Sequence, residues 1–234
     1  MRTDRSWDLP APCGICGGWT RPAGVCADCA SRFTSRATRC TRCALRVPDA
    51  VPLCGTCIRR PPLFERAFAA FDYTFPWDDA IAAFKFRQAL EWAAPLARQL
   101  ATALPVGADE AELVTAVPLA AARLRERGYN QAWELARRVA RARGRTARHD
   151  LLHRLRETPH QIHLDRAHRD ANLRGAFMPG GADARAAVRG RCVALVDDVM
   201  TTGTTANEAT RALLEAGARS VQLWVLARTE RGSD

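Results

Sequence analysis

The stretch that decides the fold is Val193-Ala-Leu-Val-Asp-Asp-Val-Met-Thr-Thr-Gly-Thr-Thr205. Its first four residues are apolar and predict a buried strand, with two adjacent carboxylates at the carboxyl end of that strand. A threonine-rich loop follows and leads into a helix predicted over Thr204–Glu215. Because ligands in open α/β sheets collect at the carboxyl ends of the strands, this stretch is a candidate ligand site.

The loop has the chemistry of an anion site. Backbone N–H groups and a helix N-terminus attract phosphate, Gly203 lets the backbone approach it closely, and threonine hydroxyls add donors. The two aspartates would repel a bare phosphate, so they suit a ligand that also carries a diol, a cation or Mg²⁺. The sequence contains no Walker A or Rossmann glycine pattern that would provide another phosphate site.

Strands and helices alternate along the chain outward from this stretch. The predicted strands are Ala67–Tyr73, Glu112–Val117, Asp150–Leu155, Arg191–Val196 and Ser220–Ala227. Helical patterns cover Trp77–Leu104, with an interruption before Pro95, and Tyr129–Arg143; residues 156–191 indicate loop with a short helix. This order implies βαβ units, and therefore an α/β protein with a mainly parallel central sheet.

Eight of the nine cysteines form four Cys-x2-Cys pairs near the N-terminus. The eight are Cys13, Cys16, Cys26, Cys29, Cys40, Cys43, Cys54 and Cys57. Two residues between cysteines allow both thiolates to point at one tetrahedral ion, whereas a disulfide framework would be reduced in the cytosol. The pattern predicts two structural zinc sites of four thiolates each, with no coordination position left open for a substrate.

The eight cysteines can be assigned to the two ions in two ways. In sequential ribbons the first four cysteines hold one ion and the last four hold the other, whereas a cross-braced module would alternate the pairs. The similar gaps inside the two halves, nine and ten residues, favour sequential ribbons. The ninth cysteine, Cys192, stands in an apolar run, and a buried, inert thiol is expected there.

The 234 residues carry a net charge of +10, and the only lysine among the 35 basic residues is Lys85. The excess lies in two blocks, +6 over residues 1–60 and +10 over residues 116–192, and such blocks indicate phosphate-bearing partners or a solvated face. Paired prolines in Arg59-Arg-Pro-Pro62 predict a linker. The domains expected are therefore a double zinc ribbon over 10–60 and an α/β domain over 64–234.

The overall composition is that of a folded protein without a membrane segment. Hydrophobic residues make up 47% and charged residues 26% of the chain. No apolar run approaches the roughly 20 residues that span a bilayer, and the first twelve residues lack the apolar core of a secretory signal. We predict a cytoplasmic protein that does not insert into membranes.

The stretch 193–205 resembles the signature of type I phosphoribosyltransferases, which bind 5-phosphoribosyl-1-pyrophosphate (PRPP) with Mg²⁺. The resemblance implies that Asp197 and Asp198 hold the ribose hydroxyls and that Thr201–Thr205 bind the 5′-phosphate. The substrate-binding stretch predicted in this way comprises Val199, Met200, Thr201, Thr202, Gly203, Thr204 and Thr205. Met200 and Thr204 depart from the Leu and Ala often found in such motifs, and neither change removes a polar contact.

Three further segments resemble the ComF family of phosphoribosyltransferase-like proteins associated with DNA uptake in competence. They are Ala116–Ala132, which includes Arg-Leu-Arg-Glu-Arg-Gly-Tyr-Asn-Gln, Thr158-Pro-His-Gln161, and Arg169–Phe177. The cysteine ribbons and Phe84-Lys-Phe86 also resemble members of that family, so that the likeness covers residues 12–230.

The family resemblance implies roles for several other residues. Arg123 and Arg127 follow the strand at 112–117 and are candidates for the diphosphate, because guanidinium forks suit phosphate oxygens. Lys85 is a candidate phosphate contact, although a packed stem between two phenylalanines is the alternative. Residues 156–177 correspond to a loop over the site. Its candidate contacts are Gln161, Arg169 and Asn172.

Two classes of function remain open at the level of sequence. As an enzyme, the chain would catalyse the departure of pyrophosphate from PRPP while an unknown acceptor attacks the oxocarbenium-like ribosyl centre. Arg123 and Arg127 would stabilise the leaving group, and Asp197 and Asp198 would hold the ribose. As a binding protein, it would handle single-stranded DNA through its arginines during transformation, or dock a competence helicase or recombination mediator.

Overall fold

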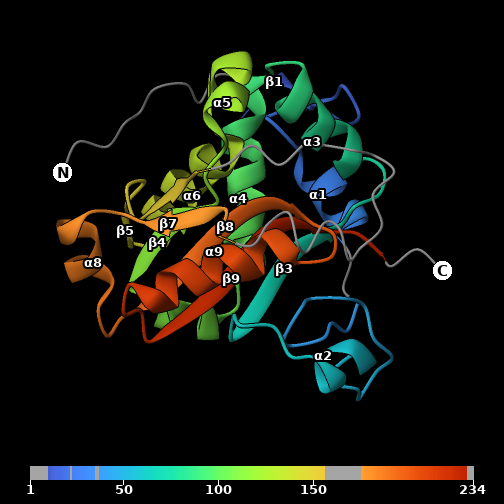
Figure 1. Ribbon diagram of the computed structural model, residues 1–234. Coiled ribbons are helices and arrows are strands. Elements are labelled where there is room, and N and C mark those ends of the chain that lie inside the picture. Colours follow the sequence, from blue (N-terminus) through green and yellow to red (C-terminus); the bar gives the residue numbers. More distant parts are fainter. Residues whose placement is uncertain (1–9, 22, 35–36, 156–174, 231–234) are drawn as a thin grey trace.

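The protein is built around one parallel sheet of five strands (Figure 1). This computed structural model describes residues 10–21, 23–34, 37–155 and 175–230. The strand order is β3-β9-β8-β4-β5, and every neighbouring pair is parallel. The strands are β3 (Arg66–Asp72), β4 (Leu113–Ala116), β5 (Thr146–Ala147), β8 (Cys192–Met200) and β9 (Ser220–Arg228).

The central strands are buried on both faces because helices cover the sheet from two sides (Figure 1). Along β8, Val193 and Leu195 pack toward α9 (Thr204–Glu215) and α8 (Ala182–Val188). Ala194 and Val196 pack on the opposite face. That face carries the helices α3 (Trp77–Phe86), α4 (Ala93–Ala103) and α6 (Gln131–Ala142). The alternation follows from the period of two in a strand, and the helices on both faces complete the α/β fold with a parallel central sheet that the sequence predicts.

Most of the predicted elements are confirmed within one or two residues at their ends. The helical pattern over 77–104 is interrupted before Pro95, as expected, where the short 3₁₀ segment η1 (Leu90–Trp92) separates α3 from α4. A second 3₁₀ segment, η2 (Val106–Glu110), precedes β4, and α5 (Ala121–Arg127) follows it. No helix in these described ranges is long and apolar enough to cross a bilayer.

Two predicted boundaries differ from the structure. The strand expected over 191–196 continues to Met200, so the two aspartates lie inside β8, where pairing with β9 extends the ladder past the apolar run. The strand expected over 150–155 forms as β6 (Leu152–Arg154), but it pairs antiparallel with β7 (Phe177–Pro179) in a separate small sheet. This pairing is non-local, and β7 lies in a region predicted as loop.

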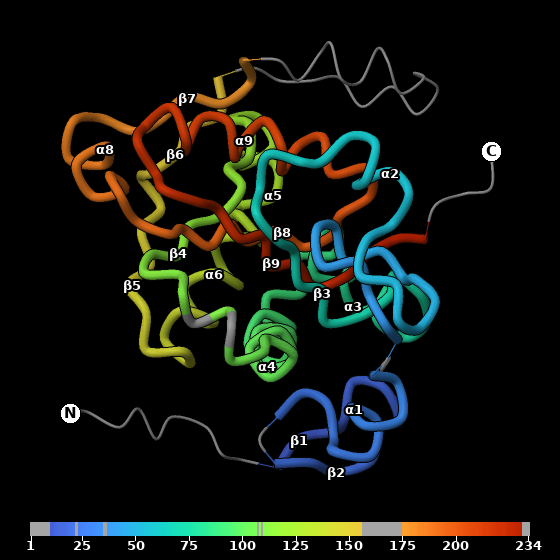
Figure 2. The backbone as a smooth tube through the Cα atoms, turned by 90° about the horizontal axis from the view of Figure 1, so that it is seen from below, coloured from blue at the N-terminus to red at the C-terminus, as the bar shows by residue number. Residues whose placement is uncertain are grey.

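The N-terminal part forms two small units that pack at different places (Figure 2). The first unit, residues 11–33, contains β1 (Ala11–Pro12), β2 (Trp19–Thr20) and α1 (Ala27–Phe33). It packs on α3 and α4: the Trp77 indole donates to the Phe33 carbonyl at 2.8 Å. The second unit, residues 38–59, contains α2 (Gly55–Arg59) and lies against the outer edge of β3, where the Ala67 N–H donates to the Thr41 carbonyl at 3.3 Å.

A buried ion-pair cluster fastens the second unit to the sheet. Asp72, at the end of β3, is 5% exposed and pairs with Arg39 at 3.0 Å and Arg46 at 2.5 Å, both from the second unit. The cysteines of this unit share one apolar cluster with Phe64 and Met200. The second unit is therefore part of the core on the α9 side of the sheet.

Candidate phosphoribosyl-binding site

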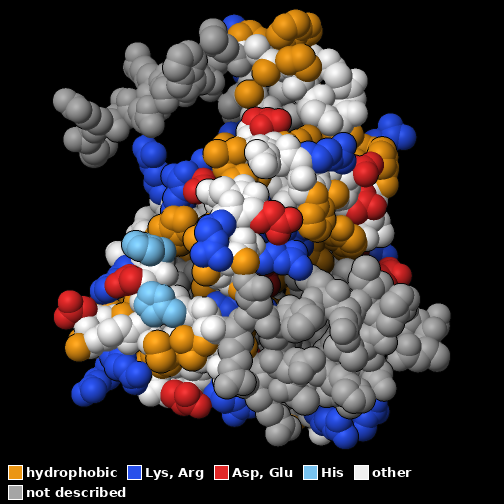
Figure 3. Space-filling view, turned by 45° about the horizontal axis from the view of Figure 1, so that its top comes forward, with side chains coloured by type: hydrophobic (Ala, Val, Ile, Leu, Met, Phe, Trp, Pro, Cys, Tyr) orange, Lys and Arg blue, Asp and Glu red, His pale blue; other side chains and the backbone are white. Residues whose placement is uncertain are grey.

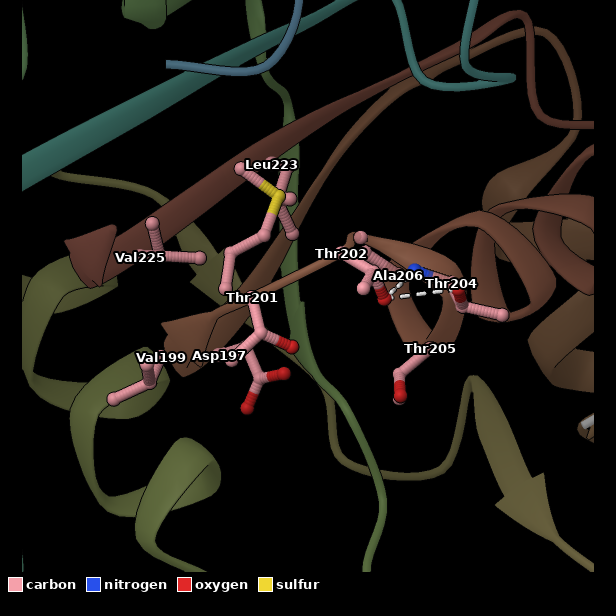
Figure 4. Close-up of a pocket in the computed structure, with 11 residues that line it drawn as sticks. Asp197, Val199, Thr201, Thr202, Thr204, Thr205, Ala206, Leu223 and Val225 are labelled. Atoms are coloured by element: carbon pink, nitrogen blue, oxygen red, sulfur yellow. Dashed lines mark hydrogen bonds between the residues drawn. The ribbon is translucent and has the colours of Figure 1, made fainter. Parts of the chain in front are cut away.

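A pocket lies where β8 ends and α9 begins (Figure 4). It is formed at the carboxyl ends of β8 and β9, which is the edge where the sequence predicts a ligand. The residues that line it are Asp197, Val199, Met200, Thr201, Thr202, Gly203, Thr204, Thr205, Ala206, Leu223 and Val225. The structure thus brings together the whole predicted loop and one of the two aspartates.

The turn between β8 and α9 presents unpaired backbone donors to this pocket. Gly203 has φ +82°, a left-handed conformation that costs other residues strain, and it lets the chain reverse into the helix. The N–H groups of Thr202, Gly203 and Thr205 make no hydrogen bond to another described residue. The Thr202 and Thr204 hydroxyls lie 3.0 Å apart. Together with the positive end of α9, these donors form a site suited to an anion.

Asp197 and Asp198 point to opposite faces of β8. The Asp197 carboxylate is partly exposed in the pocket and points to the same side as the Thr205 hydroxyl (Figure 4). Burial and the neighbouring charge of Asp198 raise the pKa of Asp197 to about 7. Asp197 therefore changes its charge close to neutral pH.

Asp198 is 3% exposed and faces α3, from which Lys85 approaches. The Lys85 ammonium lies 2.8 Å from Asp198 Oδ1, which also accepts the Val199 N–H at 2.6 Å. Burial lowers the pKa of Lys85, but the attraction of Asp198 and Asp197 outweighs it and leaves the pKa above the ordinary value. The Lys85 side chain therefore serves as the counter-ion of this aspartate, and its contact with a phosphate stays a prediction.

One oxygen of the Asp198 carboxylate is not engaged by Lys85. Asp198 Oδ2 is buried and has no hydrogen-bond partner among the described residues. A buried acceptor without a donor costs free energy, so this atom is suited to a hydroxyl or a cation supplied by a ligand.

The two arginines predicted for the diphosphate lie on α5 and do not line this pocket. The Arg127 guanidinium stacks over the Phe86 ring, 5.4 Å from its centroid, at the end of the helix that carries Lys85. Arg123 is half-buried and has no ion pair with a described residue. The remaining candidates, Gln161, Arg169 and Asn172, lie outside the described residues.

A buried arginine that the sequence did not single out lies behind the pocket. Arg228, the last residue of β9, is 3% exposed and donates to the carbonyls of Met200, at 2.9 Å, and Thr201. The signal in the sequence was a lone arginine ending an apolar strand, but only the three-dimensional structure shows what it contacts.

The eight paired cysteines form two groups, as sequential ribbons require. The first group is Cys13, Cys16, Cys26 and Cys29, and the second is Cys40, Cys43, Cys54 and Cys57. Within each group all sulfurs lie within 4.8 Å of one another. Zn–S bonds of about 2.3 Å in a tetrahedron place sulfurs about 3.8 Å apart. The distances from Cys16 to Cys26, 3.8 Å, and from Cys43 to Cys54, 3.6 Å, fit a zinc ion.

Comparison with known proteins agrees with this geometry. The family model described as "Phosphoribosyl transferase domain" matches residues 86–234. The chain therefore belongs to the phosphoribosyl transferase domain family and, within it, to the group of relatives named for competence and DNA utilization.

Two of these relatives illustrate the group. The DNA utilization protein YhgH of Salmonella typhimurium is 34% identical over 211 residues, which is 88% of this chain and 91% of the relative. Competence protein F of Haemophilus influenzae is 33% identical over 184 residues, 75% of this chain and 78% of the relative. Among solved structures, the glutamine PRPP amidotransferase from B. subtilis is 27% identical with a TM-score of 0.39, over 57% of this chain and 25% of that one.

Proposed function

We propose that this chain is a cytoplasmic, PRPP-binding protein of the phosphoribosyltransferase type that serves the uptake or use of DNA. The observation that carries the proposal is the pocket at the end of β8, where unpaired N–H groups and Asp197 surround one space. A phosphate and a sugar diol carried by one molecule match these two kinds of group. The DNA-related part of the proposal is supported by the names of the relatives.

In this proposal each part of the site contacts one part of PRPP. The loop from Thr201 to Thr205 binds the 5′-phosphate, and Asp197 accepts hydrogen bonds from the ribose hydroxyls. Asp198, held by Lys85 on the other face of β8, has one buried oxygen left for a hydroxyl or a cation of the ligand. Arg123 and Arg127 approach the diphosphate from α5. Mg²⁺ bound with PRPP would neutralise diphosphate charge, and zinc in the two cysteine groups would hold the N-terminal units folded.

Transfer of the phosphoribosyl group is the reaction that such a site would support. The bond from ribose C1 to pyrophosphate breaks and the electron pair leaves with pyrophosphate. A lone pair of the acceptor forms the new bond to C1, and the acceptor loses its proton to water. The two arginines would stabilise the charge that develops on the leaving group.

A single strand of DNA is a second candidate ligand, favoured by the names of the relatives and by the basic block over residues 116–192. Part of that block is paired internally, since Arg137 and Arg138 contact Glu134, and Arg148 contacts Asp150. On the face in Figure 3, the blue basic side chains lie among acidic and apolar ones. We therefore favour PRPP over single-stranded DNA as the ligand of this site.

The test is calorimetric titration of the protein with PRPP and Mg²⁺. We expect binding by the wild type, loss of binding in the double variant Asp197→Ala with Asp198→Ala, and wild-type affinity in Asp183→Ala, an exposed aspartate of α8. Unchanged affinity in the double variant would rule out the site. A parallel titration with single-stranded DNA at two salt concentrations tests the second candidate, because binding through phosphates weakens steeply with salt.

A further inference from the structure

Arg228 connects the phosphate loop to the second cysteine group. Its Nε donates to the Cys43 carbonyl at 3.0 Å, and its Nη1 donates to the carbonyls of Met200 and Thr201 and, at 2.8 Å, of Thr229. Cys43 is one of the four sulfur residues of the second group and is itself buried. One buried guanidinium is therefore shared by the backbone of that group and by the start of the loop.

These contacts determine where the donors of the loop point. In a trans peptide the C=O and the following N–H point in opposite directions. Because the Thr201 carbonyl faces Arg228, the N–H of Thr202 points away from Arg228, on the side of the pocket that Thr202 lines. The Met200 carbonyl orients the N–H of Thr201 in the same way.

The loop is anchored to the N-terminal part at a second point. Asn207, in the first turn of α9, accepts the Leu63 N–H at 2.6 Å, and Leu63 follows the second unit after the short segment Arg60-Pro-Pro62. The second unit is in turn fixed on β3 by the pairing of Asp72 with Arg39 and Arg46. The loop is thus held by Arg228, and the helix that follows it is held by Leu63.

We propose that Arg228 is a positioning residue for the phosphate loop: it holds the loop peptides with their N–H groups toward the pocket and ties that arrangement to the second cysteine group. A guanidinium suits this role because it keeps its charge at all ordinary pH values and donates in several fixed directions at once. The inference rests on the proposed function, since it assigns the 5′-phosphate to this loop.

The test compares two ligands that occupy different ends of the site, in Arg228→Met and in a matched control. Arg219→Met removes an arginine that is 65% exposed and lies just before the first residue of the same strand. We expect Arg228→Met to weaken binding of ribose 5-phosphate about tenfold or more and to leave binding of Mg²⁺–pyrophosphate unchanged. Arg219→Met should bind both ligands as the wild type does.

A second variant, Arg228→Lys, and a second measurement, hydrogen exchange, test the same role independently. Arg228→Lys keeps the charge but loses the fork, so it should also lose ribose 5-phosphate affinity. Hydrogen exchange over residues 200–206 should accelerate in both Arg228 variants and not in Arg219→Met. Wild-type binding and exchange in Arg228→Lys would overturn the inference, as would an equal loss of both ligands. A wild type that binds no PRPP, with exchange accelerated in the variants, would refute the function and leave the positioning role standing.

Discussion

At the scale of single residues, the ionisation of Asp197 makes ligand affinity depend on pH. Its pKa of about 7 means that the carboxylate is largely protonated below neutral pH. The ionised form offers both of its oxygens as full acceptors to the ribose hydroxyls, whereas the protonated form carries a donor on one oxygen and is a weaker acceptor. We therefore expect PRPP affinity to be full above pH 8 and to fall about tenfold as the pH drops from 8 to 6.

The measurement is a calorimetric titration with PRPP and Mg²⁺ across this range, with Asp197→Asn as the control. The ligand phosphates also titrate near pH 6, and that contribution is common to both proteins. Subtracting the control profile isolates the carboxylate. Parallel profiles for the two proteins would contradict the prediction.

The ion pair between Lys85 and Asp198 is expected to contribute to the stability of the fold. Lys85→Met leaves a nearly buried carboxylate without its counter-ion, and we expect a loss of about 2–3 kcal/mol in the free energy of unfolding, measured in urea. Adding Asp198→Asn to this variant removes the stranded charge, so the double variant should regain part of the loss. Strictly additive effects would show that the two side chains do not interact.

At the scale of elements, the turn between β8 and α9 depends on the backbone of Gly203. Its φ of +82° makes Gly203→Ala strained, and we expect it to cost about 1–2 kcal/mol of stability and to weaken PRPP binding about tenfold. Gly190, in the turn before β8, has φ +70° and provides the matched control. Gly190→Ala should lose similar stability in thermal unfolding while PRPP affinity stays at the wild-type value. Equal loss of affinity in both variants would count against a specific role for the loop.

The elements also show what the sequence can and cannot predict. The apolar run of β8, the pattern of α6 and the Cys-x2-Cys spacing are local signals, and they led to the correct sheet class and the correct grouping of cysteines. The strand β7 and the last four residues of β8 depend on partners far along the chain, which local periodicity does not record.

The candidate site follows the same division. The loop over 201–205 and Asp197 form one pocket that the local motif predicted. Other contacts join segments that are distant in the sequence. Lys85 and Asp198 are more than a hundred residues apart, and so are Arg228 and Cys43. Arg228 also joins the end of β9 to the turn that follows β8. Such contacts form only when the sheet is assembled, so local sequence patterns do not predict them. A role for Lys85 is predicted from the family resemblance, and no role is predicted for Arg228.

At the scale of the whole molecule, the two cysteine groups differ in their exposure. In the first group Cys16 is exposed, whereas all four cysteines of the second group are buried. A chelator reaches an exposed ligand first, so we expect two equivalents of zinc to be released in two phases, the faster from the first group.

A colorimetric chelator assay checks this expectation. Cys16→Ser should remove the faster phase, and Cys192→Ser, a change outside both groups, should leave two equivalents and both phases. Release of fewer than two equivalents from the wild type would contradict the two zinc sites. A single phase of two equivalents would show that burial does not govern release.

The pairing of β3 with β9 has a consequence for the order in which the protein is made. Each cysteine group is built from contacts within fewer than twenty residues, so both can form as soon as they leave the ribosome. The strand that follows them, β3, has its only sheet neighbour at the very end of the described chain. The second unit can therefore make its contact with Arg228, and the sheet edge on which it packs can be completed, only after β9 has been synthesised.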